Sequence, residues 1–228
     1  MFYCCWFSSK KSLFPAEFSA LIYNNQWYFG HVNVWTFTEL LIWVNQLRSY
    51  VSRSQCLKNF NLDEERFEFK FFARGGLRIS HIVNSRNFLS FDIRPDVCFL
   101  QIGENDICSG DEHFIARNIL SLASYLHEGI GISLVIIGQL FRRQPWASSA
   151  DFNNKIVRVN NLLKAASDTL PGVHFWHHRG FWSNMDFLSQ DGVHLKCPEG
   201  VVVSSPMHKF WRSIRSAVLH FSADCRPV

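Results

Sequence analysis

Apolar residues recur at two distinct spacings along most of the chain. Phenylalanines alternate with charged residues over residues 67–73 (FEFKFFA), and this alternation predicts a β-strand. Three further short apolar runs are typical of buried strands, and they cover residues 96–102, 132–138 and 173–177. The chain therefore offers at least four strand candidates after residue 60.

Between these strands, apolar residues fall at helical spacing. Asp111 is a candidate N-cap for the first clear helix, and residues 44–51 and 79–91 also carry helical spacing. The apolar stripes of the three clearest helices are Phe114, Ile115, Ile119, Leu122, Ala123 and Leu126; Phe152, Ile156, Val159, Leu163 and Ala166; and Met207, Phe210, Trp211, Ile214, Val218 and Phe221.

The alternation of strands and helices predicts an α/β fold, because strands joined by helices form a parallel sheet covered on both faces. We expect one domain with a mostly parallel sheet of five strands. In such sheets, ligand sites form beyond the carboxyl ends of the strands. Polar motifs that follow a strand, or that lie in the long loop before the last helix, are therefore the candidates for chemistry.

Residues 1–40 depart from this pattern, since they are crowded with aromatic residues and lack clean periodicity. We therefore expect an irregular N-terminal segment (residues 1–43), a domain (residues 44–221) and a tail (residues 222–228). An aberrant or truncated first strand within residues 1–43 is an alternative interpretation of the first segment. The chain has 228 residues, of which 47% are hydrophobic and 18% charged, and this composition excludes disorder of the whole chain. No apolar run is long enough to span a bilayer. The net charge of +4 permits an anionic partner without arguing for one.

The cysteines and glycines carry no sign of a cofactor or a metal. The cysteine count of seven is odd and no pair has C-x-x-C spacing, so we expect neither a zinc site nor a disulfide framework. This cysteine usage favours a reducing compartment. The N-terminus has apolar residues before its lysines, the wrong order for a secretory signal peptide, so none is predicted. No phosphate-binding glycine loop or dinucleotide fingerprint appears.

The first polar motif, Gly103-Glu104-Asn105-Asp106, comes directly after the apolar run that ends at residue 102. Gly103 permits a tight turn. The Asn105 side-chain amide can donate to an oxyanion, which contributes about 3 to 4 kcal/mol in the transition state of acyl transfer. Asp106 can fix the loop by accepting backbone N–H groups. The alternative interpretation is a plain strand-to-helix turn, in which these residue types are common.

The second motif covers residues 191–194 (DGVH) in the loop before the last helix. Three-residue spacing lets the Asp191 carboxylate reach one nitrogen of the His194 ring, so that the other nitrogen is presented as a general base with a set tautomer. The alternative is an Asx-type turn with a surface histidine. His177 and His178 are rival histidines, although no carboxylate lies near them in the sequence.

A third motif follows the strand at residues 67–73, where Arg74 is followed by two glycines. Gly75 or Gly76 can bring a backbone N–H close to a ligand as a second oxyanion donor. A turn that merely ends the strand is the alternative.

The order and spacing of these motifs resemble the SGNH (GDSL-type) hydrolase family. Block two of that family supplies a glycine, here Gly75 or Gly76. Block three, G-x-N-D, matches the first motif, with Asn105 as the oxyanion residue. Block five, D-x-x-H, matches Asp191 and His194, which are the acid and the base of the family.

The resemblance covers about residues 44–221. It implies a flavodoxin-like, three-layer α/β/α sandwich and an ester or acyl hydrolase that needs no cofactor and no metal. The expected substrate is a small-molecule ester or another acylated ligand. The loops over residues 139–150 and 179–190 would set its specificity.

Block one departs from the family, because no G-x-S motif supplies the nucleophile. Alignment of the helix that should follow this block puts residues 40–42 at the G-x-S triplet, so that Ile42 replaces the serine. In a gapped alternative, residues 31–35 form the first strand and Thr36 or Thr38 stands at its exit, where an activated threonine could act as the nucleophile.

Loss of the nucleophile costs on the order of a million-fold in turnover in a well-studied serine protease. The sequence therefore predicts an SGNH-type ester or acyl hydrolase domain that is catalytically impaired. A non-catalytic ligand-binding module on the same fold is the alternative, and a nucleic-acid-associated protein is a third hypothesis. The missing block reflects either a wrong or truncated gene model at the 5′ end or a true pseudoenzyme, and its coincidence with the composition break near residue 40 favours the former.

Overall fold

The computed structural model describes most of the chain after residue 94 and shorter stretches before it. The described residues are 2–5, 22–23, 26–29, 32–34, 38–43, 60–62, 67–74, 76–84, 94–197, 199 and 202–224.

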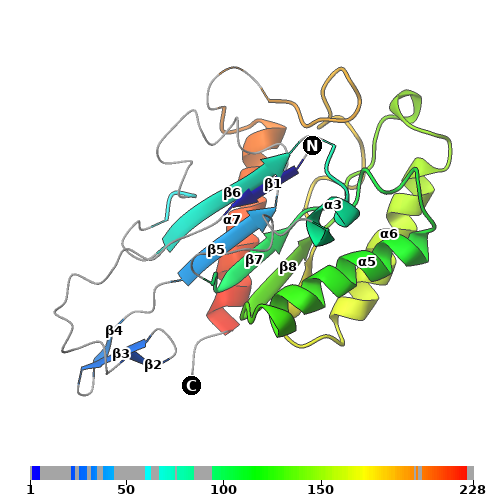
Figure 1. Cartoon of the computed structure of the whole chain (residues 1–228). Helices are drawn as coiled ribbons and strands as arrows, with labels where there is room; N and C mark the ends of the chain where they lie inside the picture. Colours follow the sequence, from blue (N-terminus) through cyan, green and yellow to red (C-terminus); the bar gives the residue numbers. More distant parts are fainter. Residues whose placement is uncertain are drawn as a thin grey trace.

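A six-stranded sheet forms the centre of the molecule, in the order β1-β6-β5-β7-β8-β9 (Figure 1). These strands are β1 (Phe2–Cys5), β5 (Thr38–Trp43), β6 (Phe67–Arg74), β7 (Val97–Leu100), β8 (Leu134–Gly138) and β9 (Val173–Trp176). Five of them are parallel, and β1 pairs antiparallel with β6 at one edge. A separate three-stranded antiparallel sheet consists of β2 (Ile22–Tyr23), β3 (Gln26–Phe29) and β4 (Val32–Val34).

The five parallel strands have the order 2-1-3-4-5 when they are counted along the chain, which is the flavodoxin-like order. The predicted α/β fold with five parallel strands is therefore confirmed, and β1 adds a sixth strand that the alternation of elements did not predict. The direction of winding reverses between β5 and β7. In sheets of this kind, that switch point is where ligands bind, beyond the carboxyl ends of the strands.

Helices cover both faces of the sheet (Figure 1). The helical elements are α3 (Ile79–Val83), α5 (Glu112–Ser124), the π-helical turn η2 (Tyr125–Gly129), the 3₁₀ turn η3 (Pro145–Ala147), α6 (Phe152–Ser167) and α7 (Pro206–Asp224). Asp111 caps α5 as predicted, since its Oδ1 accepts hydrogen bonds from His113 N at 2.8 Å and Phe114 N at 3.0 Å. The helix expected over residues 44–51 lies outside the described residues.

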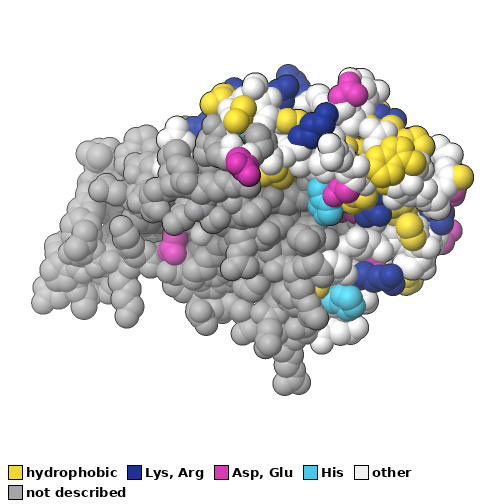
Figure 2. Space-filling model, turned by 90° about the horizontal axis from the view of Figure 1, so that it is seen from above, with side chains coloured by type: hydrophobic (Ala, Val, Ile, Leu, Met, Phe, Trp, Pro, Cys, Tyr) yellow, Lys and Arg dark blue, Asp and Glu magenta, His cyan; other side chains and the backbone are white. Residues whose placement is uncertain are grey.

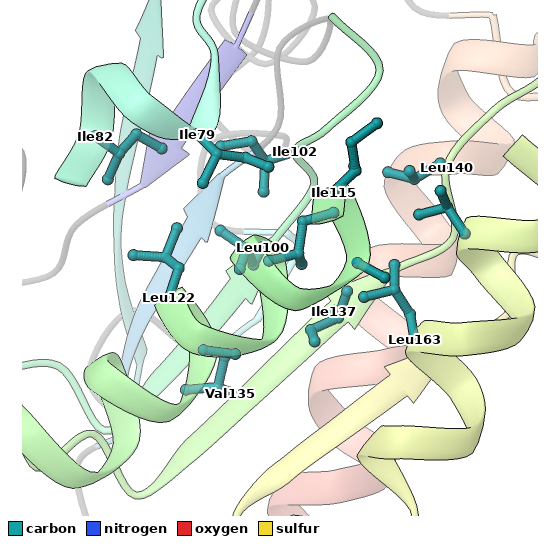
Figure 3. Packing of buried hydrophobic residues seen from close by; sticks show 14 of the residues in the cluster. Ile79, Ile82, Leu100, Ile102, Ile115, Leu122, Val135, Ile137, Leu140 and Leu163 are labelled. Carbon is teal, nitrogen blue, oxygen red and sulfur yellow. The ribbon is translucent and has the colours of Figure 1, made fainter. Parts of the chain in front are cut away.

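The hydrophobic core has two layers, one on each face of the sheet. Cys98 and Leu100 of β7 pack toward α3, α5 and α6, in the layer drawn in Figure 3. Val97 and Phe99 face the opposite layer, which α7 closes. This period-two alternation explains why β7 and β8 are apolar throughout, because both of their faces are buried.

Phe114 departs from its expected place in the core. Its side chain is 56% exposed, whereas Ile115, Ile119 and Leu122 are buried. The buried face runs through positions 115, 119 and 122 of α5 and continues at Leu126 of η2, at spacings of three and four residues. Phe114 is rotated away from this face by one residue. The expectation that Phe114 belongs to the core is therefore wrong.

The strands before residue 44 correct the gapped interpretation of block one. Residues 32–34 form β4 of the small antiparallel sheet, so they are not a strand of the parallel sheet. Thr38 opens β5 and pairs with Phe67 at the start of β6, at the opposite end from the carboxyl edge. The boundary expected after residue 43 falls at the end of β5, which is a central strand.

Replacement of Gly103 tests how the loop after β7 is built. Gly103 has φ +122°, and a Cβ there would lie 2.8 Å from Cδ1 of Ile119. We expect Gly103→Ala to lower the free energy of unfolding by about 2 to 4 kcal/mol, from backbone strain and overpacking together. Gly180→Ala is the matched control, because Gly180 has φ +83° and nothing lies within 4 Å of its added Cβ. Urea denaturation of both variants separates the effect of overpacking from that of backbone strain. An equal loss in the free energy of unfolding for the two variants would contradict the prediction.

Candidate active site

The G-x-N-D loop after β7 bonds directly to the segment after β6. Nδ2 of Asn105 donates to the carbonyl oxygen of Leu77 at 3.2 Å, and the Asp106 carboxylate accepts from the N–H of Ile79 at 3.3 Å. Burial raises the pKa of Asp106, although the Ile79 N–H and the nearby charge of Arg78 act in the opposite direction. The fold thus joins two of the three motifs that the sequence analysis selected.

Only one of the two Asn105 N–H groups is used in this contact. A primary amide carries two donors on one nitrogen. The Leu77 carbonyl engages one of them and so fixes the rotation of the amide plane. The second N–H then has a set direction, which is the property required of a donor that awaits a developing negative charge.

Asp191 and His194 contact each other directly through Asp191 Oδ2 and His194 Nδ1. The other carboxylate oxygen, Oδ1, accepts from the N–H groups of Val193 and His194, both at 2.9 Å, and from the hydroxyl of Ser189 at 2.6 Å. Because the carboxylate can only accept, His194 carries its proton on Nδ1 in this pair and leaves Nε2 as the basic nitrogen.

The turn itself sets the charge state of this carboxylate. Partial burial would by itself raise the pKa of Asp191, but hydrogen bonds from the His194 N–H, the Ser189 hydroxyl, the His194 ring and the Val193 N–H hold it well below its usual range. Asp191 is therefore ionised across the whole physiological pH range. The pair remains accessible, because the side chains of His194 and Asp191 are 42% and 48% exposed.

The loop after β8 lies between the two motif loops and contacts both. The Gln144 N–H donates to the carbonyl of Gly192 at 2.9 Å, inside the D-x-x-H turn. Its neighbour Arg143 reaches the carbonyl of Glu104, in the G-x-N-D loop, through a long contact of 3.5 Å. Adjacent residues of one loop thus touch both motifs, which places them at the same edge of the sheet.

Two asparagines of α6 hold this loop by its backbone. The amide of Asn160 accepts from Leu140 N at 2.9 Å and donates to Leu140 O at 3.0 Å. Asn153, two turns earlier, makes the same pair of bonds to the backbone of Arg143, at 2.9 and 2.8 Å. These four bonds replace the ladder partners that the chain loses where β8 ends.

Gly192 fits closely against the same loop. It has φ +68°, and a Cβ there would lie 2.8 Å from the Cβ atoms of Gln144 and Ala147. The glycine in D-x-x-H is therefore required both by its backbone conformation and by the close approach of η3.

A layer of polar side chains lies beneath these loops, and the sequence had pointed to only one of its members, His178, as a rival base. Gln101 follows β7, Gln139 follows β8 and His178 follows β9, and all three are buried. They come from three different strands, so no local spacing connects them. The only signal was position: Gln139 and His178 stand just beyond predicted apolar runs, and Gln101 stands near the end of the run over residues 96–102.

The remaining candidates have diverse positions. Gly76 is exposed with φ +68°, whereas Gly75 and Thr36 lie outside the described residues. His177 is exposed and meets the Trp182 ring edge-on, with ring centroids 6.2 Å apart. Arg142 also contacts Trp182, with its guanidinium carbon over the ring at 4.9 Å from the ring centre.

Figure 2 looks down on this edge of the sheet. In the part of that face that is described, acidic, basic and histidine side chains are interspersed with hydrophobic ones, and neither positive nor negative side chains predominate. Within the described residues, no three histidine, cysteine or acidic side chains gather as metal ligands, and no helix is long and apolar enough to cross a membrane.

No family model matches the sequence, and a search of curated proteins also found no match. Solved structures do match. A GDSL-like lipase from Bacteroides thetaiotaomicron superposes with a TM-score of 0.54 at 16% identity, over 77% of this chain and 84% of that chain. A carbohydrate esterase of family 3 from Talaromyces cellulolyticus gives 0.52 at 16% identity, over 71% and 74%. An acetyl esterase variant crystallised with acetate gives 0.53 at 16% identity, over 72% and 76%.

The chain has the SGNH-type hydrolase fold. The flavodoxin-like strand order and the three layers agree with this assignment. The resemblance read from the G-x-N-D and D-x-x-H motifs thus led to the correct fold.

The charge on Asp191 gives a pH-dependent prediction. Its pKa is lower in the folded protein than the value of about 3.9 for a free carboxyl, so its contribution to stability is full above about pH 4 and is lost as the pH falls toward the folded pKa. Because the group is half exposed, we expect Asp191→Asn to cost only about 1 kcal/mol at pH 7. Urea midpoints should show the gap from wild type closing below pH 4, and a gap unchanged at pH 3 would contradict this. Asp186→Asn, in the same loop, is the control.

Proposed function

We propose that this chain is an SGNH-type ester or acyl hydrolase domain that is catalytically impaired because its nucleophile is missing. The observation that carries the proposal is the contact of His194 Nδ1 with an Asp191 carboxylate that three further donors hold in place. This geometry suits a general base. The fold that surrounds it is that of known esterases and lipases.

In the intact reaction, His194 Nε2 would take the proton of a serine hydroxyl as its oxygen attacks the acyl carbon. Asp191 would orient the ring and stabilise the imidazolium that forms. The second N–H of Asn105 and a backbone N–H of Gly75 or Gly76 would bind the oxyanion. His194 would then return the proton to the departing alcohol, and a water molecule would release the acyl group in a second cycle.

The position of the expected serine supports impairment. The family resemblance puts Ile42 at the nucleophile, and Ile42 is the second-to-last residue of β5, in register with Phe99 of β7. It therefore lies near the carboxyl end of the strand at the switch point, where a nucleophile is needed, but its side chain carries no group that can attack.

The walls of the site fit a neutral or weakly anionic small-molecule ester. Loops 139–150 and 179–190 meet where Arg142 stacks on Trp182, and Trp146 is 68% exposed beside the D-x-x-H turn. Aromatic faces of this kind bind acyl or sugar groups without charge. A non-catalytic module that binds an acylated ligand in the same cleft is the second candidate, favoured by the loss of the serine while Asp191 and His194 stay paired.

The test is to restore the nucleophile with Ile42→Ser in the full chain. We expect no fluorophosphonate labelling and no measurable p-nitrophenyl acetate hydrolysis above background for the wild type. Ile42→Ser should become labelled, and its esterase activity should rise at least about 100-fold, since an intact nucleophile contributes on the order of a million-fold elsewhere. His194→Ala in the Ile42→Ser background should remove both signals, and His113→Ala, an exposed histidine on α5, should remove neither.

Labelling of the wild type at Thr36, Thr38 or a serine would contradict impairment and identify the nucleophile by peptide mapping. Failure of Ile42→Ser to react, with the chain folded by circular dichroism, would contradict the hydrolase site. In that case, saturable binding of an acylated ligand that His194→Ala leaves unchanged would support the ligand-binding module.

A further inference from the structure

Gln101, Gln139 and His178 form a buried hydrogen-bonded layer below the site. Their residues are 4%, 1% and 0% exposed. Gln101 donates from Nε2 to the carbonyl of Gln139 at 2.8 Å and to the carboxylate of Glu104 at 2.9 Å. Its Oε1 lies 3.3 Å from Nε2 of His178. Glu104 is the residue next to Asn105, so this layer reaches the loop that carries the candidate oxyanion donor.

The direction of every bond in this layer follows from groups that can act in only one way. A backbone carbonyl only accepts, so the Gln101 atom that faces Gln139 O must be the amide nitrogen. The other end of that amide is then an oxygen, and His178 Nε2 must donate to it. His178 therefore carries its proton on Nε2.

The other side of the ring agrees with this assignment. An indole N–H only donates, and Trp176 Nε1 donates to the hydroxyl of Ser213 at 3.0 Å. The Ser213 hydroxyl is then left to donate to His178 Nδ1, at 2.9 Å, which is unprotonated in this tautomer. A chain of donors thus runs in one direction, from Trp176 through Ser213, His178 and Gln101 to Glu104.

The surroundings of His178 keep the ring neutral. The rings of Phe99, Phe141, Phe181 and Phe210 pack around it, with centroids 4.9 to 6.2 Å away. Burial, together with the adjacent charge of His177, lowers the pKa of His178 to about 3. A ring in this place stays neutral at neutral pH, so what it contributes is the direction of its hydrogen bonds.

Gly138 makes room for the amide at the centre of the layer. A Cβ on Gly138 would lie 2.1 Å from Oε1 of Gln101 and 2.9 Å from the Phe99 ring. The end of β8 is therefore shaped around the Gln101 side chain.

We propose that Gln101 and His178 are positioning residues that set the placement of Asn105, and that His178 does so as its Nε2–H tautomer. The inference rests on the proposed function, which gives Asn105 its role at the oxyanion. In the other tautomer, a bare Nε2 would face Gln101 Oε1, and the repulsion would turn the amide over. Its N–H groups would then leave both Glu104 and the Gln139 carbonyl, and the G-x-N-D loop would lose its attachment to the layer.

The tautomer is tested first, by ¹⁵N NMR of the imidazole rings in the full chain between about pH 5 and pH 8. We expect His178 to be neutral with its proton on Nε2 throughout. His127 is an internal control of opposite sense, because its Nδ1 lies 2.8 Å from the Ile132 carbonyl oxygen and must donate to it. A proton on His178 Nδ1, or titration of His178 in this range, would overturn the proposal.

The link to the loop is tested with Glu104→Met, which removes the acceptor, and Glu104→Gln, which keeps one. We expect Glu104→Met to shift the Asn105 side-chain amide resonances and Glu104→Gln to leave them near their wild-type positions. Gln101→Met should cause the same shift, and the double variant should add nothing to it. If Gln101→Met does not fold, the two Glu104 variants decide the question. Equal Asn105 spectra in Glu104→Met and wild type would overturn the proposal.

The activity arm uses the Ile42→Ser background. There we expect Glu104→Met to lower kcat by up to about 100-fold with little change in KM, because a misplaced donor acts on the transition state. Glu104→Gln should restore most of the loss. The NMR results do not depend on turnover. A shifted Asn105 resonance without any esterase activity would therefore support the positioning role, while it would refute the proposed function. A rise in KM without a fall in kcat would overturn the role of Asn105 at the oxyanion.

Discussion

The site depends on how the backbone N–H and C=O groups beyond the end of β8 find hydrogen-bond partners. A strand that leaves a parallel sheet gives up its ladder partners, and buried N–H and C=O groups without partners cost about 1 to 3 kcal/mol each. Asn160 and Asn153 of α6 supply those partners to Leu140 and Arg143. The loop is thereby fixed against a rigid helix, and Gln144 can hold the D-x-x-H turn through Gly192. The Asp191–His194 pair is in this sense held in place from α6.

The carboxyl edge of the sheet carries polar groups at more than one depth. At the surface lie Asn105 and His194, and below them lies the layer of Gln101, Gln139 and His178. Such a layer is costly, because Nε2 of Gln139 is buried with no hydrogen-bond partner. An apolar replacement would pack at lower cost, but it could not give the loop above a defined hydrogen-bond direction. Buried polar groups of this kind lower the stability of the fold but fix the orientation of the groups that they bond to.

Strands and helices that leave a local apolar pattern could be predicted from the sequence. Features that tertiary contacts determine could not. Apolar runs and helical stripes predicted the parallel strands from β6 onward and the helices α5, α6 and α7, since burial on both faces leaves a strong signal. The assignment of Phe114 to the core failed because one residue of helical phase separates the buried face from solvent. The residue pattern did not locate β5, because residues 38–43 fit an irregular segment equally well; only the block-one alignment at residues 40–42 pointed to a first strand there. The polar layer could not be found at all, since Gln101 and His178 are 77 residues apart and meet only when β7 and β9 flank β8.

The persistence of the Asp191–His194 pair has a local explanation. Three of the four hydrogen bonds to Asp191 come from Ser189, Val193 and the backbone of His194, all within three residues of it. The turn would therefore form, and the carboxylate would stay ionised, whether or not a nucleophile stood opposite the ring. The proposed oxyanion donor is different, because Asn105 bonds to the Leu77 carbonyl 28 residues away. Gln101, which bonds to the neighbouring Glu104, is itself bonded to the Gln139 carbonyl 38 residues away. If Asn105 acts at the oxyanion as proposed, its side of the site is the more sensitive record of that role. The D-x-x-H turn is stabilised locally whether or not catalysis occurs, whereas the contacts of Asn105 and of the proposed positioning residue Gln101 depend on segments far apart in the sequence.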